Sequence, residues 1–220
     1  MRGFDDGEWQ DGELRGLTFV AGQRGMGKTT EMIRLLRACT GSAIFFDTVG
    51  RHAELLPGFK RFSQPGELKK FWLANHGRRV RVCYVPLDEF PVEHMQAVAS
   101  MVRAFGECIF AVDEVDTFCG AEHGARGMPA ELYNLVHFGR HYKVSMICTA
   151  RDPASLSIRF RSQCEFMRLF RTDEERYVKY FAARIGQKNA AKLPMLQRTY
   201  FLLWHSGQSE VRICGGPRKI

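Results

Sequence analysis

The stretch that decides the fold is GQRGMGKT, residues 22–29, which directly follows the apolar run LTFVA, residues 17–21. It fits the pattern G-x-x-x-x-G-K-[ST] of loops that bind the phosphates of a nucleotide. Its glycines allow the backbone to curl so that successive N–H groups point at phosphate oxygens. The helix expected over residues 28–39 adds the positive end of its dipole. The sequence therefore predicts a buried strand, a phosphate-binding loop and a helix, in that order.

The side chains of this loop predict ATP and Mg²⁺ as its ligands. The Lys28 ammonium is expected to reach the β- and γ-phosphates and to be catalytic, and the Thr29 hydroxyl is expected to bind Mg²⁺. Arg24 points either to the nucleotide of its own subunit or to solvent, and the sequence leaves both open. The predicted nucleotide contacts are Gly22, Gln23, Arg24, Gly25, Met26, Gly27, Lys28, Thr29 and Thr30.

A second acidic site follows the apolar run CIFAV, residues 108–112. Asp113 is expected to hold Mg²⁺ through water, and Glu114 is expected to act as the general base for an attacking water. Asp88-Glu89 is the alternative pair, but Pro86 interrupts the strand before it. The pair at 113–114 favours hydrolysis of ATP over binding alone, and Asp116 is left without a role.

The rest of the chain alternates short apolar runs with amphipathic stretches, which predicts an α/β fold with helices on both faces of a mainly parallel sheet. Residues 17–220 are expected to form one domain that closes with a β-hairpin over 198–205 and 211–214, and residues 1–16 to form a tail or peripheral strand. Thr172 is expected to cap the helix over 173–186. Residues 117–128, with three glycines, are predicted to be an exposed loop. Further strands are predicted over 42–47, 80–85, 144–149 and 166–170, and further helices over 65–76, 91–105 and 129–142.

The composition indicates which cellular compartment and which kind of binding partner to expect. The 220 residues carry a net charge of +8, which favours a polyanionic partner such as nucleic acid over a merely solvated basic surface. The seven cysteines include no C-x-x-C pair, which is typical of reduced, buried cysteines in a cytosolic protein. The histidines lack metal spacing. The sequence has neither a secretory signal nor an apolar run near the roughly 20 residues of a membrane span.

Residues 139–153, GRHYKVSMICTARDP, resemble the segment after the second acidic site in the HerA/FtsK superfamily of DNA-pumping ATPases, and the resemblance covers about residues 17–186. It implies a RecA/FtsK-like P-loop NTPase fold, a ring of identical subunits and hydrolysis of ATP coupled to movement of double-stranded DNA. One departure is the polar sensor of the family, usually glutamine, which falls at Ala150. Thr149 and Arg151 are its candidate replacements.

Within that superfamily the chain resembles the genome-packaging ATPases of viruses with an internal membrane. Phage-extrusion proteins similar to zonular occludens toxin usually add a membrane span, which is absent here. The resemblance implies a place in the host cytoplasm or with the virion, and docking to a portal or membrane-associated vertex protein. It also implies an arginine supplied to the neighbouring ATP site. Candidates for that arginine are Arg140, which has the family-like position, Arg151, Arg159 and Arg161.

Two loops are candidate DNA contacts, namely residues 117–128 with His123 and Arg126, and the basic stretch RRVR, residues 78–81. Two other functions share the phosphate loop and stay open at this point. One is a non-catalytic scaffold whose assembly ATP switches, and the other is a small-molecule phosphotransferase.

Overall fold

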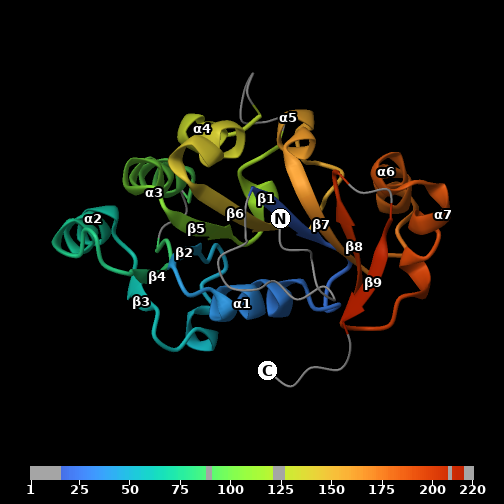
Figure 1. Ribbon diagram of the computed structural model, residues 1–220, viewed down its shortest axis with the longest axis horizontal. Helices are drawn as coiled ribbons and strands as arrows, with labels where there is room; N and C mark the ends of the chain where they lie inside the picture. Colours follow the sequence, from blue (N-terminus) through green and yellow to red (C-terminus); the bar gives the residue numbers. More distant parts are fainter. Residues whose placement is uncertain (1–15, 88–90, 121–126, 208–209, 216–220) are drawn as a thin grey trace.

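The computed structural model describes residues 16–87, 91–120, 127–207 and 210–215 (Figure 1). The expected tail over 1–15, the alternative pair Asp88-Glu89, and His123 and Arg126 of the candidate DNA loop lie outside the described residues. Those predictions therefore stay untested.

The described strands form one nine-stranded sheet in the order β3-β4-β2-β5-β6-β1-β7-β8-β9. Neighbours from β3 to β7 run parallel, whereas β8 and β9 are antiparallel additions at one edge. This confirms the mainly parallel sheet and the closing hairpin. The strands are β1 Leu17–Ala21, β2 Ser42–Phe46, β3 Lys60–Phe62, β4 Arg81–Tyr84, β5 Cys108–Val112, β6 Val144–Thr149, β7 Cys164–Phe170, β8 Tyr200–His205 and β9 Arg212–Gly215.

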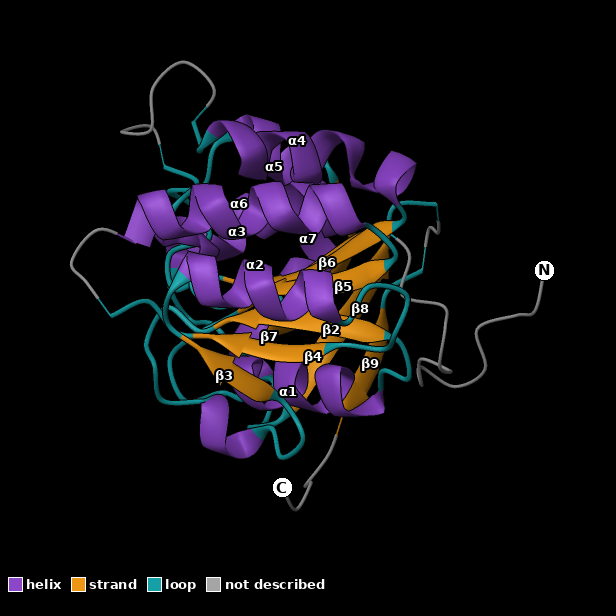
Figure 2. Cartoon of the chain, turned by 90° about the vertical axis from the view of Figure 1, so that its left-hand side faces the viewer, coloured by secondary structure: helices purple, strands orange, loops and turns teal. Residues whose placement is uncertain are grey.

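Helices cover both faces of the sheet, as predicted, but unequally. Figure 2 shows α1 beneath one face and α2 to α6 over the other. The α-helices are α1 Lys28–Ala38, α2 Pro65–Ala74, α3 Pro91–Phe105, α4 Ala130–Phe138, α5 Ile158–Ser162, α6 Glu175–Ile185 and α7 Gln187–Ala190. Short 3₁₀ turns lie at η1 Ala53–Leu55, η2 Val115–Thr117, η4 Gly139–Tyr142 and η5 Leu193–Met195.

The apolar core divides in the same way, because side chains alternate across a strand. In β2, Ile44 and Phe46 face the multi-helix side, whereas Ala43 and Phe45 face α1. Helix α1 completes its side by burying residues three and four positions apart, including Met32, Leu35 and Leu36. Both faces of the central strands are therefore largely apolar. One exception is Arg168 within β7, which is fully buried and pairs with Glu31 of α1.

Two local predictions were wrong, and one helix differs in type at its end. Helix α6 begins at Glu175, and Thr172 is not its cap, because the Thr172 side chain is fully buried and its Oγ1 has no hydrogen-bond partner. The helix predicted over 129–142 is present as α4 followed directly by the 3₁₀ turn η4, so that the segment is helical from Ala130 to Tyr142.

The second wrong prediction is the exposed loop over residues 117–128. Within the described part of that segment, Phe118, Cys119 and Met128 are buried rather than exposed. The Ser157 N–H donates to Cys119 O at 2.8 Å, which ties the segment to the chain before α5. Three short elements, β3, α5 and α7, went unpredicted because none is long enough to show a period.

Candidate nucleotide-binding site

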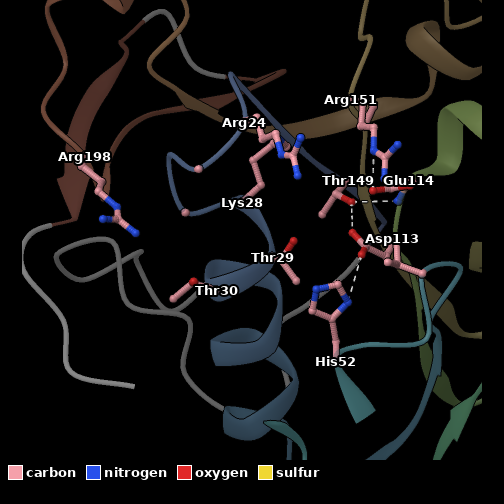
Figure 3. Close-up of a pocket in the computed structure, with 14 residues that line it drawn as sticks. Arg24, Lys28, Thr29, Thr30, His52, Asp113, Glu114, Thr149, Arg151 and Arg198 are labelled. Atoms are coloured by element: carbon pink, nitrogen blue, oxygen red, sulfur yellow. Dashed lines mark hydrogen bonds and ion pairs between the residues drawn. The ribbon is translucent and has the colours of Figure 1, made fainter. Parts of the chain in front are cut away.

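A cavity of about 540 Å³ opens at the carboxyl ends of β1, β2, β5 and β6, which is where parallel sheets place ligand sites. Figure 3 shows it framed by the phosphate loop and α1 on one side and by the ends of β5 and β6 on the other. The lining residues are Arg24, Gly25, Gly27, Lys28, Thr29, Thr30, Val49, His52, Asp113, Glu114, Thr149, Ala150, Arg151 and Arg198.

The phosphate loop has a shape that requires its glycines. Gly22, Gly25 and Gly27 have φ of +145°, +79° and +114°, a region that side chains with a Cβ rarely adopt. A Cβ on Gly22 would lie 2.7 Å from Cβ of Phe170. The Gln23 N–H donates to Arg171 O at 2.8 Å. The loop therefore rests directly on the end of β7.

Not every predicted loop contact lines the cavity. Gly22 and Gln23 turn their carbonyls to Lys28, whose Nζ donates to Gly22 O at 2.7 Å and to Gln23 O at 3.2 Å. Met26 is partly buried against the α1 side of the core. The ammonium is thus held in place inside the loop. Burial lowers the pKa of Lys28, while Asp113, Asp116 and Glu114 oppose that shift.

Asp113 lies at the end of β5, buried and surrounded by hydrogen bonds. Its backbone N–H donates to Phe46 O at 3.1 Å, and the Thr149 hydroxyl donates to its Oδ1. Burial raises the pKa of Asp113, an effect that the bonds from Thr149 and the charge of His52 reduce. Asp113 and the Thr29 hydroxyl face the same space (Figure 3), and this set of hard oxygen donors fits Mg²⁺.

The sequence did not reveal Asp47 and His52, which support Asp113 from the neighbouring strand. His52 Nδ1 lies 3.1 Å from Asp47 Oδ1 and 3.3 Å from Asp113 Oδ2. The hydrogen bond to Asp47 is the largest factor that raises the pKa of His52. Burial would raise the pKa of Asp47, but hydrogen bonds from the His52 ring and backbone hold it below its ordinary value.

These three side chains are close enough to hold a metal ion, since their ligand atoms lie within 4.8 Å of one another. The imidazole, however, already hydrogen-bonds with Asp47, and Gly50 and His52 donate their backbone N–H groups to the same carboxylate. We interpret the pair as a support that fixes Asp113. The available signal was that Asp47, like Asp113, directly follows an apolar strand.

Glu114 has a strained backbone, with φ of +54° and ψ of +53°. Such a conformation costs roughly 1–3 kcal/mol in a residue other than glycine and is common at functional sites. The Glu114 N–H donates to Thr149 Oγ1 at 2.9 Å, and Arg151 Nε donates to its carboxylate at 2.6 Å. Burial raises the pKa of Glu114, and Arg151 limits the rise.

The corner after β6 carries the two candidate replacements for the missing sensor. Ala150 is fully buried, Thr149 connects Asp113 to the backbone of Glu114, and Arg151 reaches Glu114 itself. Asp116, which had no predicted role, holds this corner by accepting the backbone N–H groups of Arg151 and Asp152. Both candidates therefore contact the acidic pair.

The remaining candidate arginines lie outside this cavity. Arg140 is on η4, before β6 begins, and so at the opposite edge of the sheet, where it pairs with Glu165 and lines a separate cavity of about 400 Å³. Arg159 and Arg161 lie on α5, and the Arg161 guanidinium lies 4.9 Å from the centroid of the Tyr180 ring. Arg198, which the sequence placed only in the closing hairpin, does line the nucleotide cavity.

Comparison with solved structures finds the same fold in several proteins. The genome packaging NTPase B204 of Sulfolobus turreted icosahedral virus 2, solved with AMPPCP, matches with a TM-score of 0.72 and 16% identity over 93% of this chain and 98% of that one. VirB4 of Thermoanaerobacter pseudethanolicus matches with a TM-score of 0.70 and 9% identity over 92% and 89% of the two chains. The N-terminal domain of zonular occludens toxin from Neisseria meningitidis matches with a TM-score of 0.51 and 11% identity over 94% of this chain and 95% of that one.

At these identities the matches show the fold alone, a P-loop NTPase-like α/β fold with an antiparallel hairpin at one edge, and they agree with the fold that the resemblance implied. B204 has also been solved with ATP-gammaS. No protein-family model and no curated protein sequence matches the chain. Among the helices of the described residues, none combines the length and the apolar character that crossing a membrane requires.

Proposed function

We propose that this protein hydrolyses ATP with Mg²⁺ and uses the turnover to translocate double-stranded DNA, most specifically to package a viral genome. The observation that carries the proposal is the convergence of Lys28, Thr29, Asp113 and Glu114 on one cavity at the carboxyl ends of the strands. The fold shared with a genome packaging NTPase and with VirB4 supports the coupling to DNA. The same cavity would serve a phosphotransferase, because a base beside the γ-phosphate can activate a substrate hydroxyl as well as water. The fold shared with a genome packaging NTPase is what favours water as the acceptor.

In the proposed reaction each of these side chains has one step. Lys28 exchanges its bonds with Gly22 O and Gln23 O for the β- and γ-phosphates. Thr29 and Asp113 would hold Mg²⁺, which would neutralise charge on the phosphates. Glu114 takes the proton of the water that attacks the γ-phosphorus, and ADP leaves with the bridging oxygen.

Arg151 gives this site a resting state. Its ion pair with Glu114 occupies one of the two carboxylate oxygens and lowers the basicity of the group that must accept a proton. The Arg151 side chain is 69% exposed and therefore free to swing towards a γ-phosphate, which would release Glu114 and bring a cation to the transferring group. In this scheme the binding of ATP moves Arg151 from Glu114 to the γ-phosphate. Arg151 thereby replaces the sensor glutamine of the family, whose position is taken by Ala150.

The DNA contact is proposed for a basic corner, which we define as Lys60, Arg61, Arg78, Arg79 and Arg81. Lys60 and Arg61 lie on the edge strand β3, paired with β4, and the arginines lie at the start of β4. In the described part of the chain, none of these cations forms an ion pair with a carboxylate. Clustered cations without counter-charges suit a phosphate backbone, which a translocase grips without reading bases.

The ring and its arginine belong to the proposal as well. Arg140, Arg159 and Arg161 lie outside the nucleotide cavity of their own subunit, so that any of them would act on a neighbour's nucleotide. The Arg140 side chain is 69% exposed despite its pair with Glu165, which leaves it accessible to a second subunit.

Turnover of ATP with and without long double-stranded DNA, at low and moderate salt, tests this proposal. We expect turnover to rise with DNA and the rise to shrink with salt, because phosphate contacts release counterions. The double variant Lys60→Glu with Arg78→Glu should keep basal turnover and lose the stimulation. Its control, Lys188→Glu with Arg212→Glu, makes the same charge change on exposed residues of α7 and β9. Turnover that is indifferent to DNA would count against translocation, and ATP binding without any turnover would favour a switched scaffold.

A further inference from the structure

The nucleotide cavity has two chemically different ends. Figure 3 shows Glu114 and Arg151 at one end and Arg198 at the other, on the far side of the phosphate loop and beyond Thr30. The first end carries the acidic pair and the residues that hold it. The second end has no role in the hydrolysis scheme.

The direction of the nucleotide follows from the chemistry of the loop. Lys28 serves the β- and γ-phosphates, and the general base must stand beside the γ-phosphate. The γ-phosphate therefore lies toward Glu114. The triphosphate then runs back along the loop, and the nucleoside must emerge at the end where Arg198 lies.

Arg198 is held in fixed relation to the loop. Its neighbour Thr199 has a left-handed backbone with φ of +72° and donates its N–H to Met26 O at 3.2 Å. A Cβ on Gly27 would lie 3.7 Å from Thr199 Cα. The start of β8 is thus attached to the loop itself. In the part of the chain that the structure describes, the Arg198 guanidinium has no hydrogen-bond or ion-pair partner.

The cavity offers few other groups that could cover a base. Among its described lining residues, the sole aromatic ring is the imidazole of His52, which hydrogen-bonds with Asp47 and faces Asp113 at the acidic end. A guanidinium is planar and stacks on aromatic faces, which an ammonium does not do. We propose that Arg198 forms the nucleoside subsite of this site and stacks on the purine base of ATP. This subsite rests on the proposed function, in which the phosphate loop binds the triphosphate of ATP, and Arg198 is the residue that holds the nucleoside.

Stacking reads the face of a base and not its edge, so it tolerates different bases. ATP and GTP should therefore bind with affinities within roughly threefold of each other, and CTP, with its smaller ring, should bind more weakly. A contact with hydrogen bonds to the base edge would instead separate ATP from GTP strongly.

Calorimetric titration can measure how much the base and the phosphates each contribute to the affinity. The probes are the β,γ-methylene analogues of ATP, GTP and CTP, and tripolyphosphate, all with Mg²⁺. Arg198→Ala should weaken the ATP analogue about tenfold and leave tripolyphosphate unchanged. Arg198→Lys keeps the positive charge but loses the planar guanidinium, and should fail to restore the affinity for the ATP analogue. Arg212→Ala, an exposed arginine on β9 outside the cavity, is the matched control and should bind as the unaltered protein does.

The alternatives give different results. An equal loss for the ATP analogue and tripolyphosphate, restored in Arg198→Lys, would make Arg198 a phosphate contact and overturn the proposal. Unchanged affinity in Arg198→Ala would overturn it as well. Both results leave binding at the loop intact. Failure of the unaltered protein to bind any of the probes would instead contradict the proposed function and, with it, this subsite.

Discussion

Replacing Thr149 by valine tests how the acidic pair is held. The Thr149 hydroxyl donates to Asp113 Oδ1 and accepts the N–H of Glu114 at 2.9 Å, and the side chain is 1% exposed. Valine has nearly the same shape and neither bond. The substitution therefore leaves a buried carboxylate and a buried N–H without this partner.

The expected cost follows from these two groups. A hydrogen bond to a charged group contributes about 1.5–3 kcal/mol, and a buried N–H left unpaired costs about 1–3 kcal/mol. Since Asp113 keeps its contact with His52, we expect the free energy of unfolding to fall by about 3 kcal/mol at neutral pH. For a chain of this size the corresponding fall in Tm is roughly 6–12 °C.

The loss should also depend on pH. The pKa of Asp113 in the folded protein is raised, chiefly by burial, and without the Thr149 hydroxyl it should rise further. The folded state then binds its proton more readily than the unfolded state, so that stability declines as pH rises from the unfolded to the folded pKa. The difference between variant and unaltered protein should therefore be largest at neutral pH and shrink in acid, where Asp113 is protonated.

Urea unfolding without divalent cations, followed from neutral pH downwards, measures both effects. Thr172→Val is the matched control, because the Thr172 hydroxyl is buried without a hydrogen-bond partner. That change should be neutral or stabilising by up to about 1 kcal/mol. A Thr149→Val loss no larger than that of the control, or a loss that does not vary with pH, would refute the reasoning.

Other variants examine separate parts of the site. Gly22→Ala places a Cβ 2.7 Å from Cβ of Phe170 at a φ of +145°, and should lower the free energy of unfolding by about 2–3 kcal/mol and abolish ATP binding; urea unfolding and calorimetry check this. Arg151→Ala removes the group that limits the raised pKa of Glu114. A general base works deprotonated, and kcat/KM reports the free enzyme, in which Arg151 pairs with Glu114. The acid limb of the pH profile of kcat/KM should therefore move to higher pH, and an unmoved limb would show that Arg151 does not affect the base. Arg140→Ala should lower turnover only in assemblies, so mixing it with a Lys28→Ala variant should restore some activity if Arg140 acts on a neighbour.

The sequence was sufficient for those parts of the site that are contiguous in the chain. The loop at 22–29 and the pair Asp113-Glu114 each follow an apolar strand, and strand, turn and functional side chain are encoded together. The strand order brings the pieces into one cavity, since β1 and β5 both adjoin β6 in a parallel sheet. A parallel sheet aligns all its carboxyl ends at one edge, which is why these two motifs could be paired without a structure.

Residues that the sequence missed depend on pairings between distant strands. Asp47 contacts Asp113 through His52 because β2 pairs with β5. No local pattern in the sequence predicts that these two strands are neighbours. Arg198 reaches the cavity because the hairpin is added antiparallel to β7, against which the loop rests. The prediction that Thr172 caps α6 failed for a related reason. Threonine is a good cap residue, but here its side chain is buried in the core.

Hydrolysis at this cavity is tested most directly by Glu114→Gln, which keeps the shape of the side chain and removes its capacity to accept a proton. The measurement is ATP binding and single-turnover hydrolysis in the same preparations, with Glu67→Gln, an exposed residue of α2, as the control. We predict that Glu114→Gln binds ATP as the unaltered protein does and hydrolyses it at least about a hundredfold more slowly. Hydrolysis at an undiminished rate in Glu114→Gln would contradict the assignment of this cavity as the catalytic site.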